Sequence, residues 1–116
     1  MARQSRLRYI TIDVNDMPTA VKFWSQALGA TPEGQSDTFQ RLVVPDSSVG
    51  IFLQLVPEPK TAKTRMHLDL VATNPTEEVE RLVKLGAKVI RPLPKAGFQF
   101  AVLSDPFENE FCVLPE

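Results

Sequence analysis

The sequence predicts an α+β fold in which one strand–helix–strand–strand–strand unit is written twice. The first observation is a near copy: the segment "FLQLVPE", which begins at Phe52, is similar to "EFCVLPE", which begins at Glu110. The two starts are separated by half of the 116-residue chain. Since a true repeat keeps one offset between equivalent points, other landmarks along the chain test this interpretation.

Two further pairs of segments keep almost the same spacing. "YITIDVND" begins at Tyr9 and "HLDLVATN" begins at His67, again separated by half of the chain. "ALGA" begins at Ala27 and "KLGA" begins at Lys84, one position short of that spacing, which requires a gap of one residue in the helix or its cap. Because identities are few, the constant order of the landmarks is what predicts the repeat.

In the first half, the strands are predicted from alternation and turn signals. Residues 7–14 alternate between apolar and polar side chains, as in a strand with one face on a core. The apolar face carries Ile10, Ile12 and Val14, and the other face carries Tyr9, Thr11 and Asp13. Strands are also predicted over residues 39–45 and 49–56, on either side of the turn-like "PDSS", with a further short strand near residues 30–33.

One helix is predicted in each half. In the first half Asp16 is a suitable N-cap for a helix from Pro18 to Leu28, and Gly29 suits its C-terminal stop. In the second half Asn74, followed by Pro75 and by Glu77 three residues after the cap, is a helix-start signal. The apolar stripes expected to face the core are Val21, Trp24, Ala27 and Leu28 in the first helix, and Val79, Leu82 and Val83 in the second.

The second half begins after residues 57–64, whose prolines and lysines favour an exposed linker. Its first strand is predicted over residues 65–72, and further strands are predicted over 88–91, 98–103 and 110–114. The predicted order is therefore βαβββ in each half.

Composition and charge exclude several classes of protein. Hydrophobic residues make up 43% of the chain, charged residues 23%, and the net charge is -1, as in an ordinary globular domain. The basic residues are scattered, so the sequence lacks the positive patch that nucleic acid or an anionic membrane requires. No signal peptide or membrane helix is visible, and the single Cys112 cannot form an internal disulfide. We expect a cytoplasmic protein without nucleic-acid or membrane partners.

With this order of elements, the chain resembles the vicinal oxygen chelate superfamily, the group of glyoxalase, bleomycin-resistance and extradiol dioxygenase proteins. The motifs that carry the resemblance are "FWSQALGA", "MHLDL" and "LSDPFENEFCVL". The resemblance covers nearly the whole chain and implies a single domain, residues 1–116, with modules at about 7–58 and 65–116. It also implies that the modules form a curled mixed sheet, a cup, with helices outside and a small-molecule site inside, and that the protein is a homodimer.

One departure from the family lies in the last hairpin. The family often reads Asp-Pro-x-Gly-Asn at this point, and Glu108 stands where the glycine would be. Because a glutamate resists a positive φ, we expect a turn of different shape here.

The resemblance also implies four site positions. In the metal-dependent members the first and the last strand of each module each donate one ligand to the cup. By motif these positions are Tyr9 and Gln54 in the first module and His67 and Cys112 in the second, and equivalent positions are again half of the chain apart. Alternation puts the apolar neighbours of these residues on the opposite face, so we expect all four side chains to point into the cup.

These four residues do not match the metal sites of the family, which usually have His or Gln, Glu, His or Gln, and Glu. Only His67 and Gln54 are of an acceptable type, and no carboxylate is present to neutralise a divalent cation. We therefore expect no metal and no other cofactor. Cys112 as a thiolate could hold Zn²⁺ or Cu⁺ together with His67, but two good ligands rarely suffice.

Ordinary structural roles compete with these interpretations. A lone histidine such as His67 is often a hydrogen-bonded structural residue, and its family position makes pocket lining an equal alternative. Cys112 is better explained as a small buried filler than as a reactive thiol, and Trp24 as a core residue. Asp69 shares a strand face with His67, where it either orients the imidazole, acts as a base or is simply solvated.

Three functional classes stay open. We favour a metal-free small-molecule binding protein, which needs only the cup with a polar floor and an apolar wall. Residues expected to line them are Tyr9, Gln54, His67, Phe52, Phe39 and Phe98. The alternative is a superfamily enzyme, a lyase, isomerase or dioxygenase, that uses a degenerate metal site or His67 and Asp69 as acid and base. The third class has a cup filled by its own side chains and acts through a subunit interface.

Overall fold

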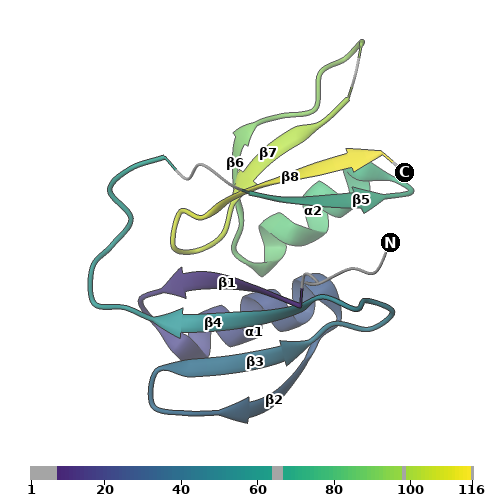
Figure 1. Cartoon of the computed structure of the whole chain (residues 1–116). Coiled ribbons are helices and arrows are strands. Elements are labelled where there is room, and N and C mark those ends of the chain that lie inside the picture. Colours follow the sequence, from purple (N-terminus) through teal and green to yellow (C-terminus); the bar gives the residue numbers. More distant parts are fainter. Residues whose placement is uncertain (1–7, 64–66, 98, 116) are drawn as a thin grey trace, which may run out of the picture. The chain divides into compact units, whose positions relative to one another are not determined.

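The chain folds as two units with the same order of elements. The computed structural model describes residues 8–63, 67–97 and 99–115. Two compact units, Met1–Glu58 and Pro59–Glu116, divide the chain and are called here the first and the second module. Within the described residues each module holds one helix and one four-stranded mixed sheet, in the order βαβββ (Figure 1). The α+β prediction is therefore confirmed.

In each module the last strand lies beside the first. The first sheet has the order β1-β4-β3-β2 and the second β5-β8-β7-β6. The pairs β1–β4 and β5–β8 are parallel, and the other neighbours are antiparallel. The bounds are β1 (Tyr9–Val14), α1 (Met17–Leu28), β2 (Thr31–Gln35), β3 (Phe39–Val43), β4 (Gly50–Leu55), β5 (Leu68–Ala72), α2 (Pro75–Leu85), β6 (Lys88–Arg91), β7 (Ala101–Ser104) and β8 (Glu110–Pro115).

The predicted strands agree closely with these bounds, but two of them begin clearly later than predicted. The strand predicted over residues 65–72 is observed as β5, which begins at Leu68, and residues 65 and 66 lie outside the described residues. The strand predicted over residues 98–103 is observed as β7, which begins at Ala101, and Phe98 lies outside the described residues. No helix in the described ranges is both long and apolar enough to cross a bilayer.

Helix α1 starts and stops where the sequence predicts. The Asp16 carboxylate accepts a hydrogen bond from the Thr19 backbone N–H at 3.3 Å, and Gly29 ends the helix with a φ of 64°. The buried face of α1 is wider than the stripe predicted from the sequence. A helix that packs on a sheet buries a broader face than a helix in a coiled coil. Trp24 and Ala27 are buried as predicted, but Ala20 and Phe23 are the other buried residues, while Val21 and Leu28 are only half-buried.

Helix α2 is capped in the same way but is more exposed. The Asn74 side chain accepts a hydrogen bond from the Glu77 backbone N–H at 3.2 Å. Leu82 is fully buried, whereas Val83, predicted on the same stripe, is 44% exposed. The α2 helix therefore anchors its module through a narrow contact centred on Leu82.

Each sheet has one face under its helix and one face away from it (Figure 1). In β1, Ile12 and Val14 are buried, so the alternation predicted from the sequence is confirmed. In β8, Phe111 and Val113 are buried in the same way. We call the opposite side of each sheet the helix-free face, and it carries Tyr9, Thr11 and Asp13 in β1, and Asp69 and Cys112 in β5 and β8.

The strand pairing corrects the predicted repeat in one respect. Ile10 pairs with Ile51, and Leu68 pairs with Phe111. The first strands and the helix caps Asp16 and Asn74 keep the predicted offset of half of the chain. With the first strands aligned in this way, the residues that pair with them in the last strands are offset by two positions more. The equivalent of Cys112 in the first module is therefore Phe52, and the predicted equivalence of Gln54 and Cys112 is wrong. A shift of two residues leaves every side chain on the same face, so alternation alone cannot detect it.

The last hairpin keeps the turn that a glycine would make. Glu108 has a φ of 67°, in the left-handed region, so the expectation of a different turn is wrong at this residue. The reason is Asp105, which is completely buried. Its carboxylate accepts backbone hydrogen bonds from Phe107 at 2.8 Å and from Asn109 at 2.9 Å. These bonds hold the turn and outweigh the strain at Glu108.

Replacing Glu108 by glycine is expected to stabilise the protein. A left-handed backbone conformation costs a non-glycine residue about 1–2 kcal/mol, and glycine avoids this strain. Part of the gain is offset because glycine makes the unfolded chain more flexible. Chemical denaturation of Glu108→Gly should therefore show a free energy of unfolding higher by about 0.5–1 kcal/mol.

Glu80→Gly provides the matched control, because Glu80 lies in the interior of α2 and is exposed. There the same change should lower the stability by about 1 kcal/mol. If Glu108→Gly were destabilised as much as this control, the positive φ would be contradicted.

Candidate functional site

An open aromatic depression, called here the cavity, lies on the helix-free face of the first sheet. Its volume is about 570 Å³, within the usual range for small-molecule sites. Strands β1, β3 and β4 contribute three aromatic rings, and the end of β2 contributes small and polar residues. The lining residues are Tyr9, Gly34, Gln35, Ser36, Phe39, Arg41 and Phe52.

Phe52 is the centre of the aromatic wall. Its ring centroid lies 4.5 Å from that of Tyr9 and 5.9 Å from that of Phe39, with interplanar angles of 52° and 83°. Such tilted and edge-to-face pairs are the arrangements that aromatic rings prefer. The three rings therefore support one another and form a preformed apolar wall.

Gly50 makes room for the Tyr9 ring. The two residues are partners in the β1–β4 register, and a Cβ at position 50 would lie 3.2 Å from two ring carbons of Tyr9. A larger residue would push the ring away, so the glycine allows Tyr9 to lie against its neighbour strand. The Arg8 guanidinium also contacts this ring, 4.6 Å from its centroid.

Gln54 does not belong to this cavity. It lies on the helix-free face as predicted, opposite Asp13 and Phe39 in the register, and is half-buried. The lining residues do not include it. Arg41, which does line the cavity, was not predicted, although in "FQRLV" it alternates onto the same face as Phe39 and could have been found by that pattern.

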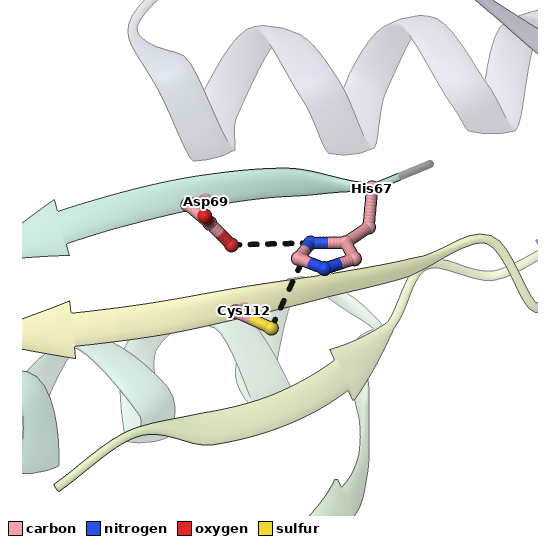
Figure 2. A group of neighbouring side chains, drawn as sticks. All are labelled: His67, Asp69 and Cys112. Atoms are coloured by element: carbon pink, nitrogen blue, oxygen red, sulfur yellow. Dashed lines mark hydrogen bonds and ion pairs between the residues drawn. The ribbon is translucent and has the colours of Figure 1, made fainter. Parts of the chain in front are cut away.

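The second module brings three reactive side chains together. His67 immediately precedes β5, Asp69 lies on β5 and Cys112 on β8, and all three point toward one another (Figure 2). The His67 Nδ1 atom lies 3.1 Å from Asp69 Oδ1 and 3.9 Å from Cys112 Sγ. The predicted sharing of a face by His67 and Asp69 is therefore confirmed, with the carboxylate positioned to orient the imidazole.

The geometry decides which nitrogen of His67 is free. Asp69 and Cys112 both approach Nδ1, and the carboxylate is the stronger acceptor, so Nδ1 carries the proton that it donates to Asp69. In the neutral ring Nε2 then carries the lone pair, and this atom has no partner among the described residues. The imidazole does not link thiol and carboxylate through its two nitrogens, as a nucleophilic cysteine requires.

Cys112 is held in its neutral form. Burial raises the pKa of the thiol, and the negative charges of Asp69 and Glu110 raise it further, while Arg91 lowers it in part. The residue is also only 8% exposed. A protonated, buried thiol is a poor nucleophile, so the structure supports the prediction that Cys112 is a buried filler.

The first module does not match the metal positions that the resemblance implies. With the corrected register, the first module presents Tyr9 and Phe52 at the two positions that the resemblance assigns to ligands, and a phenylalanine cannot coordinate a cation. In the second module one donor atom each from His67, Asp69 and Cys112 lie within 4.8 Å of one another. This group supplies a carboxylate, which the four predicted positions lack, and a metal bound there would displace the thiol proton.

Comparisons with known proteins agree with this architecture. The family model for the glyoxalase-like domain matches residues 9–114. No curated protein matches the sequence. A glyoxalase/bleomycin resistance protein/dioxygenase family enzyme from Burkholderia phytofirmans PsJN has a similar structure, with a TM-score of 0.75 and 22% identity over 96% of this chain and 98% of that one.

Two other solved structures are similar over nearly their whole length. The fosfomycin resistance protein FosX from Listeria monocytogenes has a TM-score of 0.80 and 16% identity, covering 98% of this chain and 95% of its own. TnmS3, an antibiotic binding protein from Streptomyces sp. CB03234, has a TM-score of 0.73 and 17% identity, covering 99% and 98%. At these identities the likeness shows the fold alone.

Removing the Asp69 charge is expected to lower the pKa of the Cys112 thiol. In Asp69→Asn the thiolate should form at a lower pH, and alkylation by iodoacetamide should accelerate at pH 8. The pH profile of the alkylation rate measures the shift. Asp37→Asn, in an exposed turn of the first module, is the control and should leave the profile unchanged.

The proton of the Cys112 thiol also makes the stability of the protein depend on pH. The folded state binds it more tightly than the unfolded chain, so its contribution is full below about pH 8.5 and is lost as the pH rises through the raised pKa. If the pH profile of the alkylation rate were unchanged in Asp69→Asn, the Asp69 carboxylate would not act on the Cys112 thiol.

Proposed function

Since the chain belongs to the glyoxalase-like domain family, we propose that it binds an aromatic small molecule in the cavity of the first module, without a metal ion. The observation that carries this proposal is the wall formed by Tyr9, Phe39 and Phe52 around a space of about 570 Å³. Rigid aromatic walls with a few polar groups at the rim are typical of small-molecule sites.

Physical chemistry favours an aromatic ligand here. A planar ring placed against Phe52 removes apolar surface of both partners from water, which contributes roughly 25 cal/mol for each Å² buried. The Tyr9 and Phe39 rings already contact Phe52, so little side-chain freedom is lost on binding. The polar lining residues Gln35 and Ser36 supply hydrogen-bonding groups that orient the ligand.

The structural neighbours support a small-molecule role. TnmS3 is described as an antibiotic binding protein and FosX as a fosfomycin resistance protein. The fold is thus one in which small molecules are bound. The absence of a suitable ligand set at Tyr9 and Phe52 supports binding without a cation.

A second candidate function is proton transfer by His67. Its Nε2 atom has no partner among the described residues, while Asp69 fixes the other nitrogen at 3.1 Å. A carboxylate in this position orients an imidazole and stabilises its charged form, which suits a general acid or base. The enzyme alternative therefore rests on the His67–Asp69 pair and needs no metal.

Truncation of Phe52 is expected to weaken ligand binding. 2-Naphthamide serves as a neutral aromatic probe, and its affinity is measured by calorimetry and ligand-observed NMR. Phe52→Ala should bind it roughly ten- to a hundredfold more weakly, because the centre of the wall is lost. EDTA should change neither the affinity nor the melting temperature of the wild type.

Val83→Ala is the matched control, since Val83 is an exposed apolar residue on α2. It should bind the probe like the wild type, and Phe52→Leu should keep part of the affinity if Phe52→Ala is poorly folded. A probe that binds all of these variants equally well would show that the aromatic cavity is not the binding site.

Proton transfer by His67 predicts exchange of an acidic C–H proton. In D₂O, NMR should show the protein accelerating the exchange of the α-protons of small aromatic ketones, and His67→Ala should abolish the acceleration. Asp69→Asn should slow the exchange and shift its pH profile, because the imidazole loses its orienting partner. Equal exchange with wild type and His67→Ala would exclude this function.

A further inference from the structure

We propose that the ligand of the first-module cavity is an aromatic anion, such as an aryl carboxylate, whose negative group is bound by Arg41. This inference rests on the proposed function of the cavity and names the chemical class of its ligand. It follows from the position of Arg41, from the hydrogen bond that holds it and from the absence of a described acidic partner.

Arg41 lies beside the centre of the aromatic wall. It is the register partner of Phe52 across the β3–β4 pair, so both side chains stand on the helix-free face. It is half-buried and lines the cavity. A ligand ring placed against Phe52 therefore has a cation at its edge.

One hydrogen bond fixes the guanidinium and leaves most of its donors free. The Arg41 Nε donates to the Glu33 backbone oxygen at 3.2 Å. An arginine has five N–H donors, so the four on the two terminal nitrogens remain. Their planar, parallel arrangement matches the two oxygens of a carboxylate.

No described residue neutralises this cation. Among the described ion pairs none involves Arg41, and the lining of the cavity contains no acidic side chain. The polar lining residues Gln35 and Ser36 are neutral. A half-buried charge beside an apolar wall favours a partner of opposite sign, and the ligand can supply it.

A second cation contacts the aromatic wall. Arg8 lies over the ring of Tyr9 at 4.6 Å, and its Nη1 donates to the Ser48 backbone oxygen at 3.3 Å. Arg8 thus contacts Tyr9 at one ring of the wall, while Arg41 is the register partner of Phe52 at its centre. A cationic ligand would be repelled, and a neutral one would gain nothing from either charge.

The second module has no arginine at the register position equivalent to Arg41. In the first module Arg41 pairs with Phe52, and at the equivalent position of the second module Val102 pairs with Cys112. The second module does carry an arginine nearby, Arg91, but it pairs with Val102 and lies one strand further from Cys112 than Arg41 lies from Phe52. Arg41 therefore stands in direct register with the centre of the aromatic wall, a position that the repeated unit does not require to be charged.

The test compares two probes of equal shape and different charge. 2-Naphthoate carries a carboxylate where 2-naphthamide carries a neutral amide. Calorimetry with the wild type should show naphthoate binding at least tenfold more tightly, as expected for a charge-assisted pair. Raising the NaCl concentration should weaken the binding of naphthoate but not of naphthamide.

Arg41→Gln should remove the preference for naphthoate while keeping the affinity for naphthamide, and Arg41→Lys should keep part of the preference. Lys22→Gln is the matched control, because it removes one positive charge from a position of the same module that does not line the cavity. It should leave the preference intact.

The outcomes separate this inference from the proposed function. If wild type binds both probes equally and Phe52→Ala weakens both, the cavity is a binding site but the anion selectivity is wrong. If neither probe binds, or Phe52→Ala changes nothing, the proposed function itself fails. A preference that persists in Arg41→Gln would overturn the role of Arg41.

Discussion

The parallel pairing of the first and last strand in each module is the interaction on which both candidate sites depend. In the first module it sets Tyr9 opposite Gly50 and Thr11 opposite Phe52, which brings the Tyr9 and Phe52 rings to 4.5 Å. In the second it sets Asp69 opposite Cys112. Parallel strands require a long connection, and in each module this connection includes the helix that covers the opposite face. One pairing thus creates the core and the site face together.

The two modules use the same architecture for different chemistry. The first has an aromatic wall with Arg41 at its edge, and the second has a hydrogen-bonded group of imidazole, carboxylate and thiol. Phe52 and Cys112 occupy equivalent positions in the two sheets. The modules have nevertheless diverged, because Phe52 is the centre of the aromatic wall and Cys112 is a buried neutral thiol. The backbone preserves strand faces, and the side chains on those faces are free to change.

Several site features follow from short-range patterns, and others do not. Alternation correctly placed Tyr9, Phe52 and Asp69 on faces away from the core, because the strand period is two. It could not distinguish Gln54 from Phe52 as the equivalent of Cys112, because both alternatives have the same parity. The prediction that Tyr9, Gln54, His67 and Cys112 share one cup stays a prediction, since each module is described by itself.

The sequence by itself determined the elements, their order and their caps, because these depend on residues within a few positions of one another, such as Asp16 with Thr19 and Asn74 with Glu77. Only the tertiary structure decided the strand register, the cavity beside Arg41 and the free nitrogen of His67. These depend on contacts between residues far apart in the chain, where a shift of two residues changes every neighbour while leaving the local pattern intact.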